Sequence, residues 1–269
     1  MSEKTIGFIG GGNMGSAIIG GILTSGISNP DHLIAADRSA DAREKLKASF
    51  SIRTTENNTE AARTADILFL AVKPNIFSSV IPEIRNSVPE DSVIVSIAAG
   101  QTIAKIEALF AREIKLVRAM PNTPALVGAS MSALSPNKNV TAGELTEIQA
   151  IFESFGEAEI VGENLMDTVT AVSGSSPAYV YLFIEAMADA AVADGMPRTQ
   201  AYKFAAQSVM GSAKMVLETG KHPGELKDMV CSPGGTTIEA VAELEKAGFR
   251  GTVISAQRAC CEKSKEMSR

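Results

Sequence analysis

The chain has 269 residues, of which 45% are hydrophobic and 5% aromatic, and its formal net charge is −6 at pH 7. That length and apolar content suit one large globular unit or two domains, and the scattered lysines and arginines form no basic stripe of the kind that binds nucleic acid. The longest strongly apolar run, residues 67–72, is far too short to cross a bilayer, so we expect neither nucleic acid nor membrane as a partner.

The first part of the chain alternates β-rich runs with helical patterns. A strand at residues 5–9 begins so early that no signal peptide is expected before it, and residues 13–25 follow with apolar side chains at helical spacing. This alternation predicts an α/β fold with a parallel, doubly wound Rossmann-type sheet. The further predicted strands are 32–36, 65–72, 92–98, 114–120, 129–134 and 157–161, and the helices between them are 41–50, 76–87, 102–111 and 141–155.

The second part, after Val161, contains almost no β-like run. We therefore expect a dinucleotide-binding Rossmann domain at 1–162, followed by an all-α substrate-binding and dimerisation domain at 163–269. Helix faces this rich in Ala, Met and Gly need neighbours to cover them, which predicts a homodimer. The predicted helices of this part are 177–194, 197–218, 236–247 and 252–267.

Residues 10–15 match the pattern G-x-G-x-x-G between a predicted strand and a predicted helix. In that context Gly10 would allow the tight turn, Gly12 would let the backbone approach a pyrophosphate, and Gly15 would let the helix pack against the strand. The motif therefore predicts a dinucleotide site, against the alternative of a glycine-rich turn without a ligand.

The second strand ends in Asp37, Arg38 and Ser39. Asp37 lies about 20 residues past Gly15, where NAD enzymes place the acid that binds the ribose. Arg38 can instead clamp a 2′-phosphate, and Ser39 can donate a hydrogen bond to it. The two indications oppose each other. The reach of Arg38 favours NADPH, with NADH as the alternative, and kcat/KM for the two cofactors distinguishes them.

Three further strand ends are expected at the same edge of the sheet, since the carboxyl ends of parallel strands line the cofactor crevice. Lys73, in the first of them at 71–74, is expected to contact the cofactor or to shape its loop. Small residues at 96–100 would let a nicotinamide ring lie against the sheet, and two prolines make the loop at 120–124 rigid.

The chain offers no convincing proton donor for the reduction of a ketone. Its two histidines are His32, expected near the adenine side, and His222, expected in a surface turn. Lys214 could serve as a buried acid, but its aliphatic stem is expected to pack against neighbouring side chains instead. Carboxylate pairs suited to hydrolysis and clusters suited to a metal are also missing. A protonated imine already carries its own proton, so the enzyme would mainly have to orient it against the nicotinamide. A small imino acid would also bring a carboxylate for the protein to bind.

Residues 230–237, with the sequence VCSPGGTT, open a predicted helix. Backbone N–H groups from Gly234 onward, together with the hydroxyls of Thr236 and Thr237, could hold a carboxylate at the helix start. The alternative of equal weight is an ordinary Ser/Thr N-cap. Cys231 is expected to be a small packing residue rather than a nucleophile.

The cysteines are three in number, Cys231, Cys260 and Cys261, and none forms a CxxC pair. An odd number with two adjacent residues does not suit a disulfide framework or a zinc site. We therefore expect a reduced, cytoplasmic protein without a metal.

Together these motifs resemble the pyrroline-5-carboxylate reductase family, over almost the whole chain. The matching segments are 6–15, 65–74, 95–100, 118–125, 172–192 and 226–241, of which the last two are the most specific. The family reduces L-1-pyrroline-5-carboxylate, a cyclic imine bearing a carboxylate, to L-proline with NAD(P)H in the last step of proline biosynthesis. Its members form dimers through swapped helices, often assembled into rings, so the resemblance implies a homodimer that can build a larger ring such as a decamer.

The resemblance also implies individual site residues. Thr237 matches the hydroxyl that faces the imine nitrogen and is the candidate catalytic residue. Arg38 matches a position that contacts the adenosine-side ribose or phosphate, whereas Asp37 departs from the small or polar residue common there, which leaves the cofactor preference open. The implied cofactor-binding residues are Ile9, Gly10, Gly11, Gly12, Asn13, Met14, Gly15, Arg38, Asn58, Ala71, Val72, Lys73, Pro74, Ala98 and Ala99. The implied substrate-binding residues are Val230, Ser232, Gly234, Gly235, Thr236 and Thr237.

Two alternative functions stay open on the sequence. A β-hydroxyacid-dehydrogenase-like oxidoreductase would need a catalytic Lys in the helical domain and an alcohol substrate, and the loop at 230–237 argues against it. A non-catalytic NADP-sensing dimer would be expected to lose that polar loop, which this chain keeps. Oxidation of NADPH in the presence of pyrroline-5-carboxylate separates the three functions.

Overall fold

The computed structural model describes residues 4–268 and divides into two compact units. The first contains the chain up to Ser175 together with the residues from Cys260 onward, and the second is Ser176–Ala259. This division differs from the predicted boundary at residue 162, because the segment 163–175 packs with the sheet and the end of the last helix returns to the first unit.

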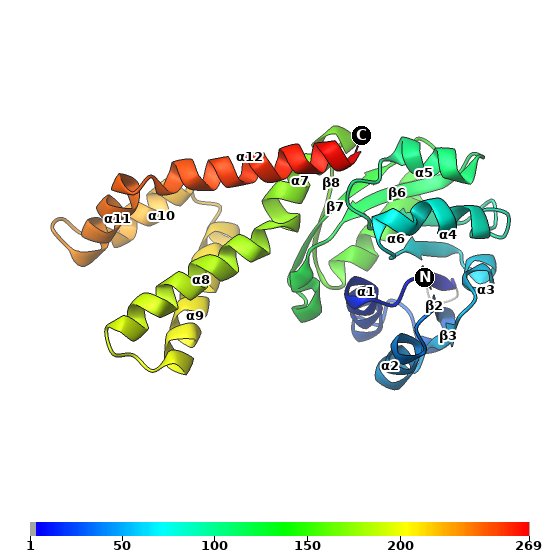
Figure 1. Cartoon of the computed structure of the whole chain (residues 1–269), viewed down its shortest axis with the longest axis horizontal. Coiled ribbons are helices and arrows are strands. Elements are labelled where there is room, and N and C mark those ends of the chain that lie inside the picture. The colour runs from blue at the N-terminus through cyan, green and yellow to red at the C-terminus, as the bar shows by residue number, and fades with distance from the viewer. Residues whose placement is uncertain (1–3, 269) are drawn as a thin grey trace. The chain divides into compact units, whose positions relative to one another are not determined.

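The first unit is built on one eight-stranded sheet in the order β3-β2-β1-β4-β5-β6-β7-β8. Figure 1 shows this sheet with its helices. The strand order reverses between β1 and β4, and in doubly wound sheets a ligand crevice opens at such a switch point. The strands are β1 (Ile6–Ile9), β2 (Leu33–Ala36), β3 (Arg53–Thr55), β4 (Ile67–Leu70), β5 (Val93–Ser96), β6 (Lys115–Met120), β7 (Ser130–Pro136) and β8 (Gly156–Ile160).

The sheet is not parallel throughout, which corrects the sequence prediction. β7 runs antiparallel to β6, with Val117 opposite Pro136, whereas the other neighbouring strands are parallel. A parallel crossover needs a dozen or more residues, and the link at 121–129 is too short for one. The edge strand β3 was not predicted, because three residues are too few to show a period.

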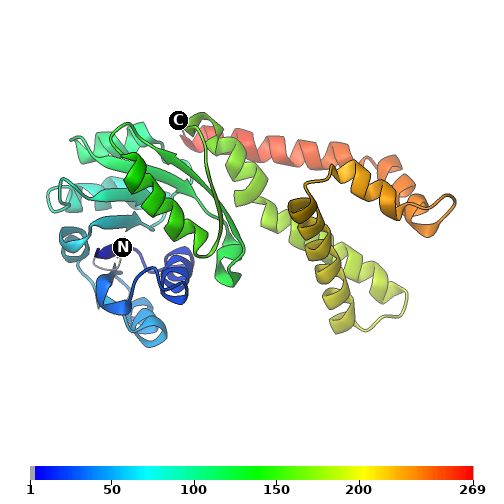
Figure 2. The same cartoon turned by 180° about the vertical axis from the view of Figure 1, so that it is seen from behind.

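Helices cover both faces of the sheet (Figures 1 and 2). The longer helices of this unit are α1 (Asn13–Thr24), α2 (Ala40–Phe50), α3 (Asn58–Thr64), α4 (Phe77–Ile84), α5 (Ile103–Phe110) and α6 (Ala142–Glu153). The shorter elements are α7 (Met166–Val169), the 3₁₀ helices η1 (Pro30–His32), η2 (Pro74–Ile76), η3 (Thr123–Val127) and η4 (Glu163–Leu165), and a π-helical turn, η5 (Thr170–Gly174).

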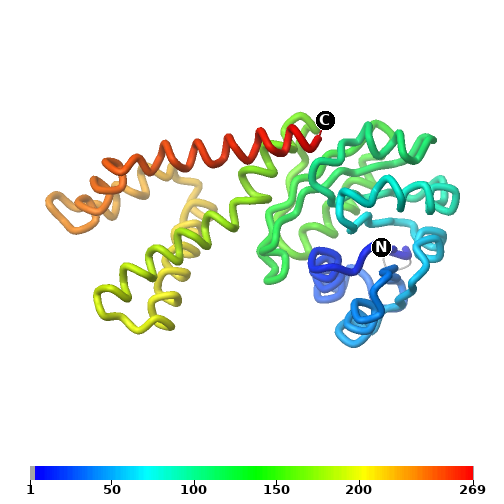
Figure 3. The backbone as a smooth tube through the Cα atoms, in the orientation of Figure 1, coloured from blue at the N-terminus to red at the C-terminus, as the bar shows by residue number. Residues whose placement is uncertain are grey.

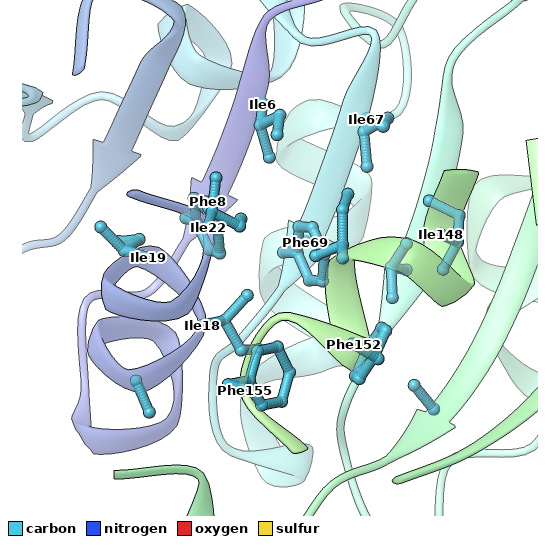
Figure 4. Close-up of a cluster of buried hydrophobic side chains, with 14 of the residues drawn as sticks. Ile6, Phe8, Ile18, Ile19, Ile22, Ile67, Phe69, Ile148, Phe152 and Phe155 are labelled. Carbon is cyan, nitrogen blue, oxygen red and sulfur yellow. The ribbon is translucent and has the colours of Figure 1, made fainter. Parts of the chain in front are cut away.

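Alternation along the strands sends side chains into two separate cores. Phe8 and Phe69 face the core beneath α1 and α6, where their rings stack at 4.8 Å between centroids (Figure 4). Ile9 and Leu70 face the second core, with residues of α3, α4 and α5. Strands buried on both faces are continuously apolar, which is why the central strands were predicted from the sequence at nearly their observed positions.

The second unit is helical throughout (Figure 3). Its helices are α8 (Ser176–Ala193), α9 (Arg198–Thr219), α10 (Pro223–Val230), α11 (Thr236–Lys246) and the first part of α12 (Phe249–Ser268). Large apolar side chains remain exposed on it, among them Leu182 at 67%, Phe204 at 66% and Leu217 at 81%. A single copy of this unit therefore leaves apolar helix faces uncovered. The short helix α10 was missed from the sequence.

Candidate functional site

In the glycine loop after β1, Gly10 and Gly15 are required by the fold, whereas Gly12 leaves open space beside the backbone. Gly10 has a φ of +104°, and a Cβ there would lie 2.7 Å from the Ala71 carbonyl oxygen. A Cβ at Gly15 would lie 2.8 Å from the Gly10 carbonyl oxygen. A Cβ at Gly12 would meet nothing within 4 Å, so the space beside this residue is open, as the close approach of the backbone to a pyrophosphate would require.

Helix α1 begins directly at this loop without a side-chain cap. Gly12 is its N-cap residue, and no acidic side chain lies in its first turn. Unpaired N–H groups at a helix start carry a partial positive charge and attract anions. The start of α1 therefore has the charge and the open space that a phosphate group requires.

The Asp37 carboxylate is engaged by the backbone around it. Its Oδ2 accepts a hydrogen bond from Gly11 N at 2.8 Å, and its Oδ1 accepts one from Ser39 N at 2.9 Å. Asp37 thus braces the glycine loop against the end of β2. This contact supplies a structural reason for an acidic residue at a position where the sequence raised the question of a ribose-binding acid.

Arg38 and Asn58 meet at a shared carboxylate. Glu83 Oε2 accepts a hydrogen bond from Asn58 Nδ2 at 3.1 Å and lies 3.8 Å from Arg38 Nη2. The Arg38 side chain is 77% exposed. Arg43 donates to the carbonyl oxygens of Asp37 and Arg38 at 2.7 and 3.1 Å, which holds the backbone of this turn. Neither Arg43 nor Glu83 was singled out in the sequence: Glu83 acts through a residue 25 positions away, and Arg43 acts through backbone carbonyl oxygens that belong to no motif.

A cavity of about 250 Å³ opens between these groups. It is smaller than the roughly 300–1,000 Å³ of most ligand pockets, so it would hold only part of a dinucleotide. Ile76 and Val80 line it without having been predicted, although they follow the strand end at 71–74 within two turns. The predicted cofactor residues in its lining are Gly10, Gly12, Arg38, Asn58, Ala71, Val72 and Lys73.

The other predicted cofactor residues lie outside this cavity. Ala98 is 5% exposed and follows β5, whose Ser96 pairs with Leu70 of β4, so the 98–99 segment belongs to the same edge of the sheet. Ile9 is fully buried in the second core and can face a cofactor only through its backbone. The remaining residues outside the lining are Gly11, Asn13, Met14, Gly15, Pro74 and Ala99.

The predicted substrate loop lies in the second unit, between α10 and α11. Val230 ends α10 and Gly234 has a φ of +65°. Gly235 is the N-cap residue of α11, which begins at Thr236 without any side-chain cap. The ordinary Ser/Thr N-cap that the sequence left open is therefore not formed, and the N–H groups of the first turn stay available to an anion.

Thr237 occupies the second position of α11 and is half-buried, whereas Thr236 is exposed. Within residues 4–268, neither hydroxyl makes a hydrogen bond to another side chain or to the backbone. Ser232 lies close to Gly235, since a Cβ on that glycine would clash with the Ser232 hydroxyl. Cys231 follows α10 as its C-cap residue and is a free thiol.

Comparisons with known proteins match this chain along its whole length. It is 56% identical to the pyrroline-5-carboxylate reductase of Escherichia coli (strain K12), with 99% of each chain covered. It is 44% identical to the one of Methanosarcina acetivorans, with 100% of both covered. The chain belongs to the pyrroline-5-carboxylate reductase family.

Family models and a solved structure agree with that membership. Residues 163–267 match the model described as pyrroline-5-carboxylate reductase dimerisation, and residues 5–100 match NADP oxidoreductase coenzyme F420-dependent. The crystal structure of the Plasmodium falciparum reductase with NADP bound superimposes with a TM-score of 0.91 at 38% identity, covering 100% of both chains. The predicted family and the predicted fold class, a Rossmann-type domain followed by a helical dimerisation domain, are both confirmed.

Two structural features are absent from residues 4–268. No helix in that range is long and apolar enough to cross a membrane. No group of three or more His, Cys, Asp and Glu side chains there could hold a metal ion.

Proposed function

We propose that this chain reduces L-1-pyrroline-5-carboxylate to L-proline with NADPH, as the final step of proline biosynthesis. The observation that carries the proposal is full-length similarity at 56% identity to a reductase of that name. The uncapped start of α11, beside two threonines, supports it because it offers a place for the substrate carboxylate. The absence of an evident catalytic histidine also agrees with an acceptor that is already protonated.

In this reaction the substrate loop binds and orients the imino acid. The N–H groups of the first turn of α11 hold the carboxylate, and the Thr236 hydroxyl donates to it. The Thr237 hydroxyl faces the imine nitrogen and keeps the C=N bond oriented for hydride addition. Val230, Ser232, Gly234 and Gly235 shape the loop around the ring.

In the cofactor site, Gly12 and the start of α1 face the pyrophosphate, and Asn58 and the strand end at 71–73 line the crevice. Ala98 and Ala99 lie on the nicotinamide side. When bound, NADPH supplies the hydride. The residues around it contribute position and charge, and no titratable side chain of the cavity has to transfer a proton.

NADPH is favoured over NADH because the carboxylate that would repel a 2′-phosphate is already engaged. Asp37 is held by Gly11 N and Ser39 N, whereas the Arg38 guanidinium is exposed and only weakly paired, 3.8 Å from Glu83. We expect Arg38→Ala to lower the ratio of kcat/KM for NADPH to that for NADH by about 10- to 100-fold, the range for a hydrogen bond to a charged group.

Arg53→Ala is the matched control for this cofactor experiment. Arg53 is also exposed and lies 3.8 Å from a glutamate, Glu60, but it begins β3 at the opposite end of the strand pairing from Arg38. Steady-state kinetics with both cofactors should leave the ratio of this variant unchanged. An equal change in both variants, or none in Arg38→Ala, contradicts the role of Arg38.

The activity itself is tested by loss of NADPH absorbance with pyrroline-5-carboxylate as the substrate and by detection of proline. Turnover that yields proline supports the proposed function. Binding of NADPH without turnover would favour the non-catalytic sensor, and turnover of a β-hydroxyacid instead would favour the other alternative.

For assembly, we propose a homodimer formed through the helical unit, which can build a larger ring such as a decamer. The exposed Leu182, Phe204 and Leu217 support it, since apolar faces of this size are normally covered by a partner. Light scattering should give at least twice the monomer mass at micromolar concentration, and a monomer there would overturn the proposal. We place this assembly in the cytoplasm, where three free cysteines stay reduced.

A further inference from the structure

The Asp167 carboxylate binds the last turns of α12. Asp167 Oδ1, in α7, accepts hydrogen bonds from the Ser264 hydroxyl at 2.6 Å and from the Ser268 hydroxyl at 3.0 Å. Ser264 is only 5% exposed, and it is the buried residue of its helix. Two hydroxyls one turn apart on α12 therefore share a single acceptor, which sets both the position and the rotation of the helix end.

The helix end held in this way covers the loop after β5. Gly100 has a φ of +72°, and a Cβ there would lie 2.9 Å from Met267 Cβ and 3.3 Å from the Met267 carbonyl carbon and oxygen. Lys105 Nζ donates to the same Met267 carbonyl oxygen at 3.3 Å. Met267 thus contacts the loop on one side and α5 on the other, and the close approach leaves no room for a side chain at residue 100.

A second carboxylate from the same segment holds the far end of this loop. Glu163 Oε1 accepts a hydrogen bond from Ile103 N, in the first turn of α5, at 2.7 Å. The loop between β5 and α5 is therefore held at its end by Glu163 and covered in its middle by Met267. Within this loop, Gly100 is the residue whose backbone can adopt other conformations, because glycine has no Cβ and can take positive or negative φ.

We propose that Asp167 is a positioning residue for the cofactor, because it holds α12 over Gly100 and so keeps Ala98 and Ala99 in place beside the nicotinamide. This inference rests on the proposed function, since it takes those two residues as cofactor contacts. The physical reason is that a displacement of about 1 Å at a positioning element can cost about 100-fold in rate. Asp167 acts through Ser264, Ser268 and Met267, and not by contact with the cofactor.

The test compares Asp167→Ala, Asp167→Asn and the double variant Ser264→Ala/Ser268→Ala in the full-length chain. Asp167→Ala removes the shared acceptor, Asp167→Asn keeps an amide oxygen that can accept, and the double variant removes both hydroxyl donors while leaving Asp167 intact. Thr146→Ala is the control, since it removes an exposed hydroxyl that bonds within its own helix. The measurements are the Kd for NADPH by fluorescence, amide hydrogen exchange of residues 98–105, and KM for both substrates.

We expect Asp167→Ala and Ser264→Ala/Ser268→Ala to raise the Kd and KM for NADPH on the order of ten-fold, in keeping with a displaced positioning element. Exchange at 98–105 should accelerate, whereas KM for pyrroline-5-carboxylate stays within about two-fold. Asp167→Asn should recover most of the affinity. An unchanged Kd in both variants overturns the proposal, and so does faster exchange throughout the chain, because that result shows a purely structural role.

This experiment stays informative if the proposed function is wrong. NADPH binding and amide exchange need no imino-acid substrate, so a wild-type chain that binds NADPH without turning over pyrroline-5-carboxylate fails the proposed function alone. Failure of the positioning role would instead appear as full activity in the wild type and unaltered cofactor affinity in both variants.

Discussion

We expect Thr237→Ala to lower kcat/KM for pyrroline-5-carboxylate by roughly 10- to 1,000-fold, the range for the loss of one positioned donor. The reason is the position of its hydroxyl at the uncapped start of α11, half-buried and without a hydrogen-bond partner among residues 4–268. Such a hydroxyl is available to the substrate in a way that a capping hydroxyl is not. Steady-state kinetics at saturating NADPH measure the effect.

Two companion variants separate loss of the hydroxyl from damage to the loop. Thr237→Ser keeps the hydroxyl and should retain activity within a few-fold. Thr219→Ala removes a hydroxyl that bonds to the Met215 carbonyl oxygen in α9 and should have no effect on kcat/KM. The Kd for NADPH should be the same in all three. Unchanged kinetics in Thr237→Ala would show that the Thr237 hydroxyl does not orient the imine.

Glu163→Ala should lower the free energy of unfolding by about 3 kcal/mol, the lower end of the range for breaking a buried ion pair. Arg118 is 4% exposed on β6, and its Nη1 lies 3.0 Å from Glu163 Oε1. Removing the carboxylate leaves that guanidinium charged and buried, and it also removes the acceptor for Ile103 N. The lower end is expected because the Glu163 side chain is 34% exposed, so water offsets part of the loss.

Urea denaturation measures this effect against a matched surface pair. Glu113 lies 3.8 Å from Lys138, with both side chains more than four-fifths exposed at 84% and 82%, and Glu113→Ala should cost less than about 1 kcal/mol. The double variant Glu163→Ala/Arg118→Met should regain stability, because it removes the unpaired charge. Equal losses in Glu163→Ala and Glu113→Ala would show that water already reaches Arg118.

The prediction for Thr237→Ala could be made from the sequence, whereas the prediction for Glu163→Ala needed the folded structure. Thr237 was named from the sequence, through a short motif whose loop and helix start are local features. Glu163 was not named, because its role depends on Arg118, which lies 45 residues away in the chain. Asp167 is a similar case, since its partner Ser264 is 97 residues away. Neither pair produces a period or a motif that a single sequence could display.

For Asp37, the position in the fold was predictable from the sequence, but its hydrogen-bond partner was not. Its place at the end of β2 was predicted, and with it the conflict between an acid suited to NAD and an arginine suited to NADP. Its partner, Gly11 N at 2.8 Å, lies 26 residues earlier and is brought near by the pairing of β1 with β2. The packed structure therefore explains the carboxylate in a way that its position in the chain did not.

Most helices and strands, and the family, could be predicted from the sequence alone, whereas β3 and α10 could not. Continuous apolar runs predicted the buried strands, the glycine pattern predicted the turn into α1, and the motifs at 172–192 and 226–241 predicted the reductase family. These features are local, because hydrophobic periodicity and backbone freedom depend on near neighbours. The reversal of β7, the return of residues 260–268 to the first unit, and the hydrogen bonds of Glu163 and Asp167 appear only in the folded structure. Those outcomes depend on contacts between groups that lie far apart in the chain. Burial increases the importance of these contacts, because a buried polar group has no water to bond with and needs a hydrogen-bond partner from the protein.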